Sequence, residues 1–192
     1  MSEHRFPFTV EPWKVLNENK EYITPIFKLL KRRYRLESEN LEADFYVLDA
    51  PEWTNVIAFT PEREIILVEQ YRYGTREPTL EIPGGMVDDG EEPLEAIKRE
   101  LREETGYVDG NWQPLGKVSA NPAILNNYTH LYLAENCRFA GAENPDEHER
   151  IHVHIMPVDK FLDYIHDGTI HHTIVVAAAA RFMLYLEQQR QE

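Results

Sequence analysis

Three glutamates in one short stretch, Glu100, Glu103 and Glu104, have the side-chain type and the spacing of a cation-binding site. An α-helix turns by about 100° per residue, so these side chains fall within one arc of roughly 100°. Like charges one turn apart destabilise a helix by roughly 0.2–0.5 kcal/mol, and Arg99 supplies a single positive charge among them. A bound divalent cation would balance the three carboxylates. Because they offer only oxygen donors, Mg²⁺ or Mn²⁺ is favoured over Zn²⁺. A solvated acidic helix is the alternative that the glutamates alone leave open.

The residues around these glutamates predict a helix preceded by a tightly turned backbone. Residues 93–105 contain no glycine, and no proline after Pro93. Proline is well placed in the first turn of a helix, and Gly106 would end it. Gly84 and Gly85 follow an expected strand, where glycine permits tight backbone geometry. A backbone carbonyl of this glycine pair could therefore approach the same cation.

The glycines and glutamates also belong to a longer pattern. From Gly85 the chain has five residues, Glu91, seven residues, the run REL, one residue, the pair EE, one residue and Gly106. This pattern is similar to the signature of the Nudix hydrolases, and Tyr107 is a mild departure where an aliphatic residue is more usual. The resemblance implies an α/β (α+β) fold, the Nudix-type α/β/α sandwich with a mixed sheet. It also implies Mg²⁺-dependent hydrolysis of a nucleoside diphosphate linked to another moiety.

The resemblance also assigns roles to residues of the signature. Glu91 and Arg99 are expected to form an ion pair that orients the loop and the helix, and with Glu103 they would complete the catalytic group. The expected metal ligands are Glu100, Glu104, Glu103 as an additional ligand or bridge, and the backbone carbonyl of Gly84.

Features outside the signature resemble one branch of this family, the ADP-ribose and nucleoside diphosphate sugar pyrophosphatases. The run EQYRYG resembles their Gln-aromatic-Arg strand, in which Arg72 would contact the substrate phosphates. Pro122 stands at about the spacing that marks the ADP-ribose group, and Glu81 is assigned to substrate binding together with these two residues. The stretch SANPAILNNYTH departs from the Ser-Pro-Gly stretch with a glutamate that ADP-ribose enzymes tend to have. Nucleotide sugars such as GDP-mannose or ADP-glucose therefore stay open as substrates.

The stretch DEHERIHVH resembles the acidic loop and following strand that supply a catalytic glutamate in the same branch. In that alignment Glu149 takes the position of the general base, and Glu147 is the near alternative. A carboxylate there could deprotonate a water whose pKa a metal ion has lowered. A solvated acidic linker is the structural alternative for this stretch.

The order of the remaining segments predicts a mixed α/β or α+β domain with helices covering a sheet. A helix over residues 173–190 has apolar residues around most of its circumference, so we expect it to be buried. A shorter helix would be capped by Asp159 and continue to Tyr164. By the resemblance, residues 1–50 form an N-terminal β-rich dimerisation subdomain and residues 51–192 the Nudix hydrolase domain. Strands are expected at residues 13–16, 26–34, 43–48, 55–60, 65–68, 79–82, 116–119, 130–134 and 151–156.

Composition and charge narrow the classes of protein to which the chain can belong. It has 192 residues, 42% of them hydrophobic, and a formal net charge of −14, so it can bury a core and repels nucleic-acid phosphates. Cys137 is the single cysteine and allows no intrachain disulfide. No leader pattern and no membrane span is expected. We therefore expect a cytoplasmic protein that takes a small-molecule nucleotide diphosphate, binds neither nucleic acid nor membrane, and, by the resemblance, forms a homodimer.

Two other functions are compatible with the same resemblance. One is a catalytically silent nucleotide-binding or sensing module, which the intact glutamates disfavour. The other is a Nudix hydrolase that acts on other nucleotide substrates, such as capped RNA or an oxidised nucleoside triphosphate, which the acidic surface disfavours. The pair His171-His172 before the last helix is expected to be structural, because it has no carboxylate neighbours in the sequence.

Overall fold

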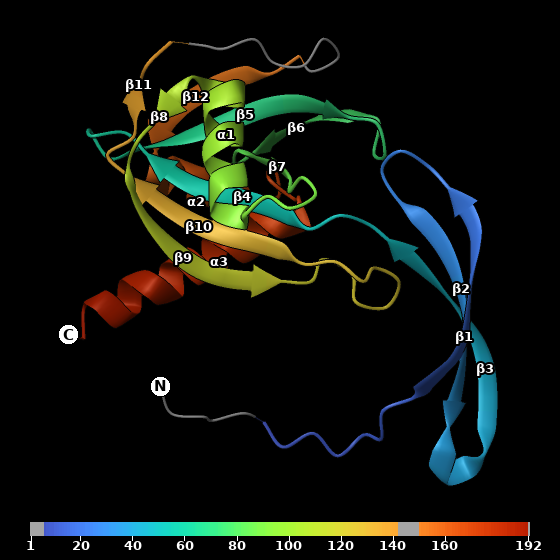
Figure 1. Cartoon of the computed structure of the whole chain (residues 1–192). Helices are drawn as coiled ribbons and strands as arrows, with labels where there is room; N and C mark the ends of the chain where they lie inside the picture. The colour runs from blue at the N-terminus through green and yellow to red at the C-terminus, as the bar shows by residue number, and fades with distance from the viewer. Residues whose placement is uncertain (1–5, 142–149, 192) are drawn as a thin grey trace. The chain divides into compact units, whose positions relative to one another are not determined.

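The computed structural model of the chain describes residues 6–141 and 150–191 (Figure 1). The chain separates into two compact units, residues 1–50 with 121–126 and residues 51–120 with 127–192. The glutamate-rich helix lies in the second unit. No helix of the described ranges is long and apolar enough to cross a membrane.

The first unit is an antiparallel sheet of three strands in the order β1-β2-β3. Its strands are β1 (Lys14–Ile23), β2 (Lys28–Leu36) and β3 (Leu41–Asp49), with a one-turn 3₁₀ helix, η1 (Glu37–Glu39), between the last two. The segment 121–126 joins this unit through β3, because the Leu48 N–H donates to the Ile124 carbonyl at 2.7 Å. Every residue of β1 is exposed, so this strand covers no core of its own.

The second unit is built on a mixed sheet of seven strands. Five of them follow the order β12-β5-β4-β10-β9, while β6 pairs with β5 and β7 pairs with β4. Only the pair β4 and β10 is parallel among these pairings of described strands. The strands are β4 (Trp53–Phe59), β5 (Glu64–Arg72), β6 (Glu77–Glu81), β7 (Gly84–Met86), β9 (Asn111–Val118), β10 (Thr129–Glu135) and β12 (His152–Pro157), and a separate two-stranded ladder joins β8 (Tyr107–Val108) to β11 (Arg138–Phe139).

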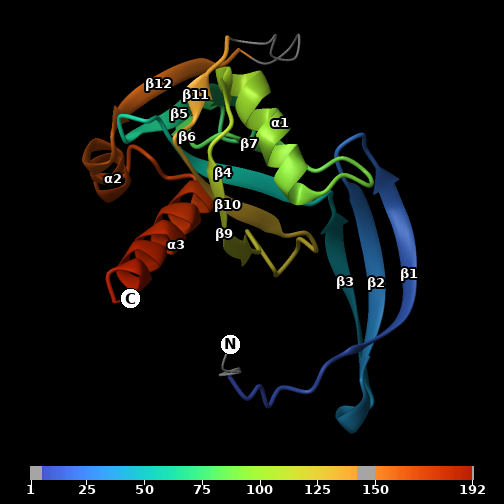
Figure 2. The ribbon, with the colours of Figure 1, turned by 60° about the vertical axis from the view of Figure 1, so that its left-hand side comes forward.

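Helices cover both faces of this sheet, because successive side chains of a strand point to opposite faces. Val56 and Ala58 of β4 pack in the core cluster that contains the buried residues of α1 (Pro93–Thr105). Ile57 and Phe59 pack in the larger cluster, to which α2 (Val158–His166) and α3 (Thr173–Gln189) contribute. Figure 2 shows α1 and α3 on opposite sides of β4 and β10. The predicted α/β/α sandwich with a mixed sheet is confirmed.

The helix that carries the glutamates begins and ends where the sequence predicts. Pro93 occupies its first turn, and Gly106 caps it in the left-handed region with a φ of 72°. This conformation favours glycine, which has no side chain to clash with the backbone. Residues 93–105 thus form one regular helix, which packs against β4 and β7.

Several boundaries differ from the sequence prediction. β1 extends to Ile23 rather than ending at residue 16, and β9 begins at Asn111 rather than at residue 116. Both strands continue through polar residues because their ladder partners supply the backbone hydrogen bonds. Asp159 does not cap α2, which begins one residue earlier at Val158 with Pro157 in the cap position.

The predicted burial of the last helix is wrong for part of its surface. Val175, Ala178, Ala179 and Phe182 are buried against the sheet, whereas Met183 and Leu184 are 54% and 55% exposed. One helix on one face of a sheet can bury only the stripe that faces it. The apolar residues on its other side are therefore exposed in this structure.

Candidate active site

The glycine pair is held against strand β4 by backbone pairing. β7 pairs antiparallel to β4, with Gly84 opposite Asn55 and Gly85 opposite Thr54. The Asn55 side chain reinforces this contact, since its Nδ2 donates to the Pro83 carbonyl at 3.3 Å. The sequence predicts tight backbone geometry at this point, but it does not predict that residues 84–86 form a strand.

A side chain at either glycine would clash, and the group that it would meet differs between the two positions. A Cβ atom on Gly84 would lie 2.3 Å from the Thr54 carbonyl oxygen and 2.2 Å from Asn55 Nδ2. A Cβ atom on Gly85 would lie 2.3 Å from the carboxylate carbon of Glu100. The absent side chain of Gly85 is thus the space into which the Glu100 carboxylate fits.

Two carboxylates of α1 meet this glycine backbone. Glu100 packs against Gly85, and Glu104 Oε2 accepts a hydrogen bond of 2.9 Å from the Gly84 N–H. The predicted proximity of α1 to the glycine pair is therefore present in the structure. Gly84 makes this contact through its N–H, while a ligand role for its carbonyl stays a prediction.

Arg99 joins the loop before α1 to the helix itself. Its Nε and Nη2 donate to the two oxygens of Glu91 at 3.2 and 3.1 Å, and Nη2 also reaches the Met86 carbonyl at 3.2 Å. Its Nη1 donates to Glu100 at 2.8 Å and to Glu103 at 3.1 Å. The hydrogen bonds from Arg99 lower the pKa of Glu91, and that pairing in turn raises the pKa of Arg99.

Arg72 and Glu81 form a second ion pair, on the neighbouring strands β5 and β6. Arg72 Nε and Nη2 donate to the two oxygens of Glu81 at 2.7 and 2.6 Å, and Thr79 Oγ1 donates to Glu81 at 2.5 Å. Glu81 is 1% exposed, while the Arg72 side chain keeps 32% of its surface exposed. Burial pushes the pKa of Glu81 upward, but the hydrogen bonds and the charge of Arg72 outweigh it, so the pKa is lowered. The pair holds a guanidinium at the surface in a fixed orientation.

The other predicted site residues are placed differently. Pro122 is exposed and lies in the first unit, whereas Arg72 and Glu81 lie in the second. Glu147 and Glu149, the predicted general base and its alternative, lie outside the described residues. Arg99, Glu100 and Glu103 come together as expected, with Glu103 directed to Arg99.

The donor set at the glycine pair suits a hard divalent cation in part. Glu100 and Glu104 offer carboxylate oxygens, which are ligands that Mg²⁺ accepts. Within residues 6–141 and 150–191, however, no three His, Cys, Asp or Glu side chains converge as a metal-binding group. Two carboxylates leave coordination positions for water and substrate oxygens, as magnesium sites in phosphate-processing proteins do.

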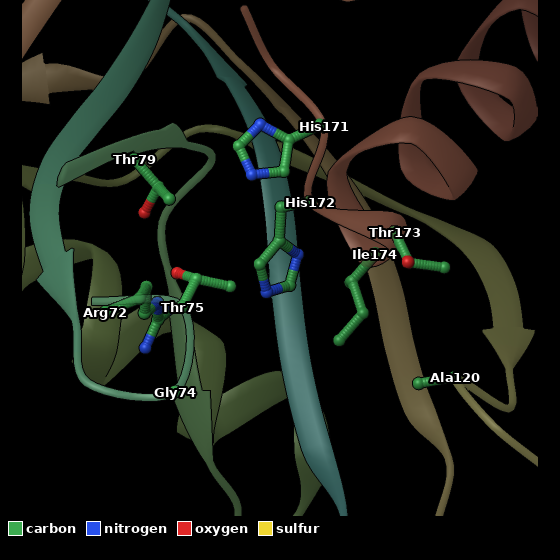
Figure 3. Close-up of a pocket in the computed structure, with 9 residues that line it drawn as sticks. All are labelled: Arg72, Gly74, Thr75, Thr79, Ala120, His171, His172, Thr173 and Ile174. Atoms are coloured by element: carbon green, nitrogen blue, oxygen red, sulfur yellow. The ribbon is translucent and has the colours of Figure 1, made fainter. Parts of the chain in front are cut away.

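A cavity of about 500 Å³ adjoins Arg72 on the side of α3 (Figure 3). His172 lies in the middle of its wall, with Arg72 and Thr75 on one side and Thr173 and Ile174 on the other. The His172 Nε2 is 3.9 Å from Glu81 Oε2, although the two residues are far apart in sequence. No local signal in the sequence points to this neighbour, which is why the sequence predicts only a structural role for His172.

Comparisons with known proteins find relatives of this chain. The sequence model of the NUDIX domain matches residues 52–176. The chain is 34% identical over 130 residues, 67% of its length, to a methanol dehydrogenase activator of Bacillus methanolicus, of which the match covers 70%. It is 38% identical over 80 residues, 42% of its length, to an ADP-ribose pyrophosphatase of Bacillus subtilis, of which the match covers only 43%.

A solved structure gives the same fold. The crystal structure of an ADP compounds hydrolase superposes with a TM-score of 0.82 over 95% of this chain and 98% of that one. The two sequences are 21% identical.

Proposed function

The chain belongs to the NUDIX family, and from this premise we propose that it hydrolyses the pyrophosphate bond of ADP-ribose or another nucleoside diphosphate sugar. The products are a nucleoside monophosphate and a sugar phosphate. The observation that carries the proposal is the meeting of Glu100 and Glu104 with the backbone of Gly84 and Gly85. It brings the carboxylates of the signature helix to strand β7, which pairs with β4 in the sheet.

Glu100, Glu104 and the Gly84 carbonyl would hold a divalent metal ion, Mg²⁺ or alternatively Mn²⁺. The ion, when bound, neutralises the diphosphate and lowers the pKa of a water molecule. Arg99 fixes Glu100 and ties it to Glu91, so the helix and the loop keep one geometry. Glu103 shares the same arginine and can serve as an additional ligand when that contact opens.

Arg72 is the group that would bind the phosphates of the substrate. Its orientation is set by the two-point contact with Glu81, and guanidinium groups match phosphate oxygens in the same bidentate way. A surface with a net charge of −14 repels a diphosphate, so a fixed cation and a metal ion are both needed to admit one. Glu149, or Glu147, would act as the general base.

The substrate class is supported by the comparisons, which include an ADP-ribose pyrophosphatase among the relatives. We propose that the protein acts in the cytoplasm as a homodimer. The first unit supports an association between copies, since Val15, Tyr22 and Ile23 of β1 are 48%, 65% and 62% exposed. Sedimentation of the purified chain tests this; a monomer at micromolar concentration would contradict it.

The decisive assay measures monophosphate release with Mg²⁺ from ADP-ribose, ADP-glucose, GDP-mannose and UDP-glucose, beside capped RNA and nucleoside triphosphates. Glu104→Gln should lower activity by roughly 100-fold, because it removes a charged ligand from the reacting centre. Glu95→Gln is the matched control, since Glu95 lies on the same helix, is exposed, and pairs with Lys98 instead. Binding of these nucleotides without turnover would favour a silent sensing module.

A second candidate rests on the relative that is named a methanol dehydrogenase activator. The chain would then change the activity of a dehydrogenase, with or without hydrolysis of a nucleotide. Addition of the protein to a purified methanol dehydrogenase tests it, and Glu104→Gln separates the two forms. An unchanged rate with the wild-type protein removes this candidate.

A further inference from the structure

Arg72 lines two cavities of different chemical character. One is the cavity of about 500 Å³ beside α3, and the other, of about 570 Å³, lies on the side of Arg150. Arg72 and Gly74 line both of them. A diphosphate bound to Arg72 would therefore have a separate space available on each side.

The cavity on the Arg150 side offers aromatic rings. It is lined by Tyr71 and Tyr73, whose ring centroids are 5.5 Å apart, and both side chains are exposed. Aromatic faces of this kind stack with nucleobases. This side suits the planar end of a nucleoside diphosphate sugar.

The cavity beside α3 offers hydroxyl and imidazole groups instead. Three threonines and two histidines line it, while none of its lining residues is Phe, Tyr or Trp. Its cation, Arg72, is already held by the buried carboxylate of Glu81, so the pair adds no net charge. Such a lining is poor for a nucleobase and for a second phosphate, but it matches the donors and acceptors of a polyol.

His172 has one ring nitrogen, Nδ1, without a hydrogen-bond partner among the described residues. This nitrogen is buried. Burial lowers the pKa of His172, although the nearby charge of Glu81 opposes this effect. The ring is therefore neutral at neutral pH, with one nitrogen as donor and the other as acceptor.

We propose that the cavity beside α3 is the subsite for the sugar of a nucleoside diphosphate sugar, with His172, Thr75 and Thr173 hydrogen-bonding to its hydroxyls. The proposal rests on the proposed function, because it assigns the part of the substrate beyond the phosphate on Arg72. His172 and the two threonines then determine the choice between sugars. The nucleoside lies on the side of the tyrosines.

Conservative variants test the subsite with little risk to folding. Thr75→Val and Thr173→Val remove hydroxyls at nearly constant volume, and His172→Asn shortens the remaining polar group. Each should lower kcat/KM for ADP-ribose by roughly 5- to 30-fold, the effect of one or two lost hydrogen bonds. Hydrolysis of the P-methyl ester of ADP, which has no sugar beyond the diphosphate, should change less than about twofold.

His166→Ala is the matched control, because His166 is exposed at the end of α2 and does not line the cavity. It should leave the rates for both substrates unchanged. Equal losses for ADP-ribose and the methyl ester in the three cavity variants would overturn the subsite while leaving the proposed hydrolysis intact.

A binding measurement decides the subsite even if no nucleotide sugar is hydrolysed. Ribose 5-phosphate is added to protein labelled at histidine, and the imidazole signals are followed by NMR, with His172→Asn used to assign the signal of His172. A shift of that signal by ribose 5-phosphate, absent in Thr75→Val Thr173→Val, supports the sugar subsite independently of turnover. No shift at saturating ribose 5-phosphate overturns it.

Discussion

The guanidinium of Arg72 donates two hydrogen bonds, 2.7 and 2.6 Å long, to the carboxylate of Glu81. The carboxylate is buried, while the side chain of Arg72 is partly exposed. Strand β6 thus supplies the anchor and strand β5 the group that is anchored. The buried carboxylate therefore holds the guanidinium in one orientation.

Glu81→Gln should therefore impair both activity and stability. A buried neutral amide cannot balance Arg72, so we expect a loss of about 1–3 kcal/mol in the free energy of unfolding, less than for a fully buried pair because Arg72 is partly exposed. KM should rise as the arginine loses its orientation. Urea denaturation and steady-state kinetics measure the two effects, and Glu187→Gln, an exposed change on α3, is the control.

The same residue predicts how stability depends on pH. The pKa of Glu81 is lowered in the folded protein, so its contribution is fully present above the unfolded value of about 4.3 and is lost as pH falls through the folded pKa. Denaturation at a series of pH values from 7 to 3 should show wild type losing more stability than Glu81→Gln below about pH 4.3. Parallel curves for the two proteins would contradict the assignment.

Alanine at the two glycines should give two different defects. The Cβ of Gly84→Ala meets the Thr54 carbonyl in the sheet, a backbone atom that cannot move aside, so Tm should fall. The Cβ of Gly85→Ala meets the end of the flexible Glu100 side chain, so Tm should change little while kcat falls by roughly 10-fold or more. Thermal unfolding beside kinetics distinguishes them, and equal Tm losses would show that Glu100 is not the sensitive contact.

Arg99→Lys should lower activity although it keeps the charge. A lysine ammonium cannot contact Glu91, Glu100 and the Met86 carbonyl together, as the guanidinium does. We expect a fall of roughly 10-fold or more in kcat/KM, with partial loss of order between loop and helix. Arg102→Lys, an exposed change three residues further along α1, provides the comparison; similar losses in both would remove the special role of Arg99.

Binding of a divalent cation should be visible as stabilisation. A ligand at 100 times its Kd stabilises a folded protein by about 2.7 kcal/mol, so Mg²⁺ should raise Tm of the wild-type protein. The rise should be smaller in Glu100→Gln and in Glu104→Gln, and unchanged in Glu95→Gln. An equal rise in all four proteins would place the cation elsewhere.

The sequence by itself determined the bounds of the signature helix and the positions of its side chains around the axis. Pro93 and Gly106 mark its ends, and the positions of Glu100, Glu103 and Glu104 around its axis follow from helical geometry, which is local. The pairing of Glu91 with Arg99, eight residues apart, was expected from the family resemblance. Short-range rules predicted the helix and the positions of its glutamates, and the signature pattern predicted the ion pair.

The tertiary structure decided what lies far apart in the chain. His172, which precedes α3, meets Glu81 at the end of β6 only in the folded chain, and the space at Gly85 is known only once α1 lies against β7. Met183 and Leu184 of α3 are exposed for a similar reason, since a helix buries only the side that meets the sheet. Such contacts depend on packing between elements, which residue type and spacing do not encode locally, and they determine the cavity that we assign to the sugar.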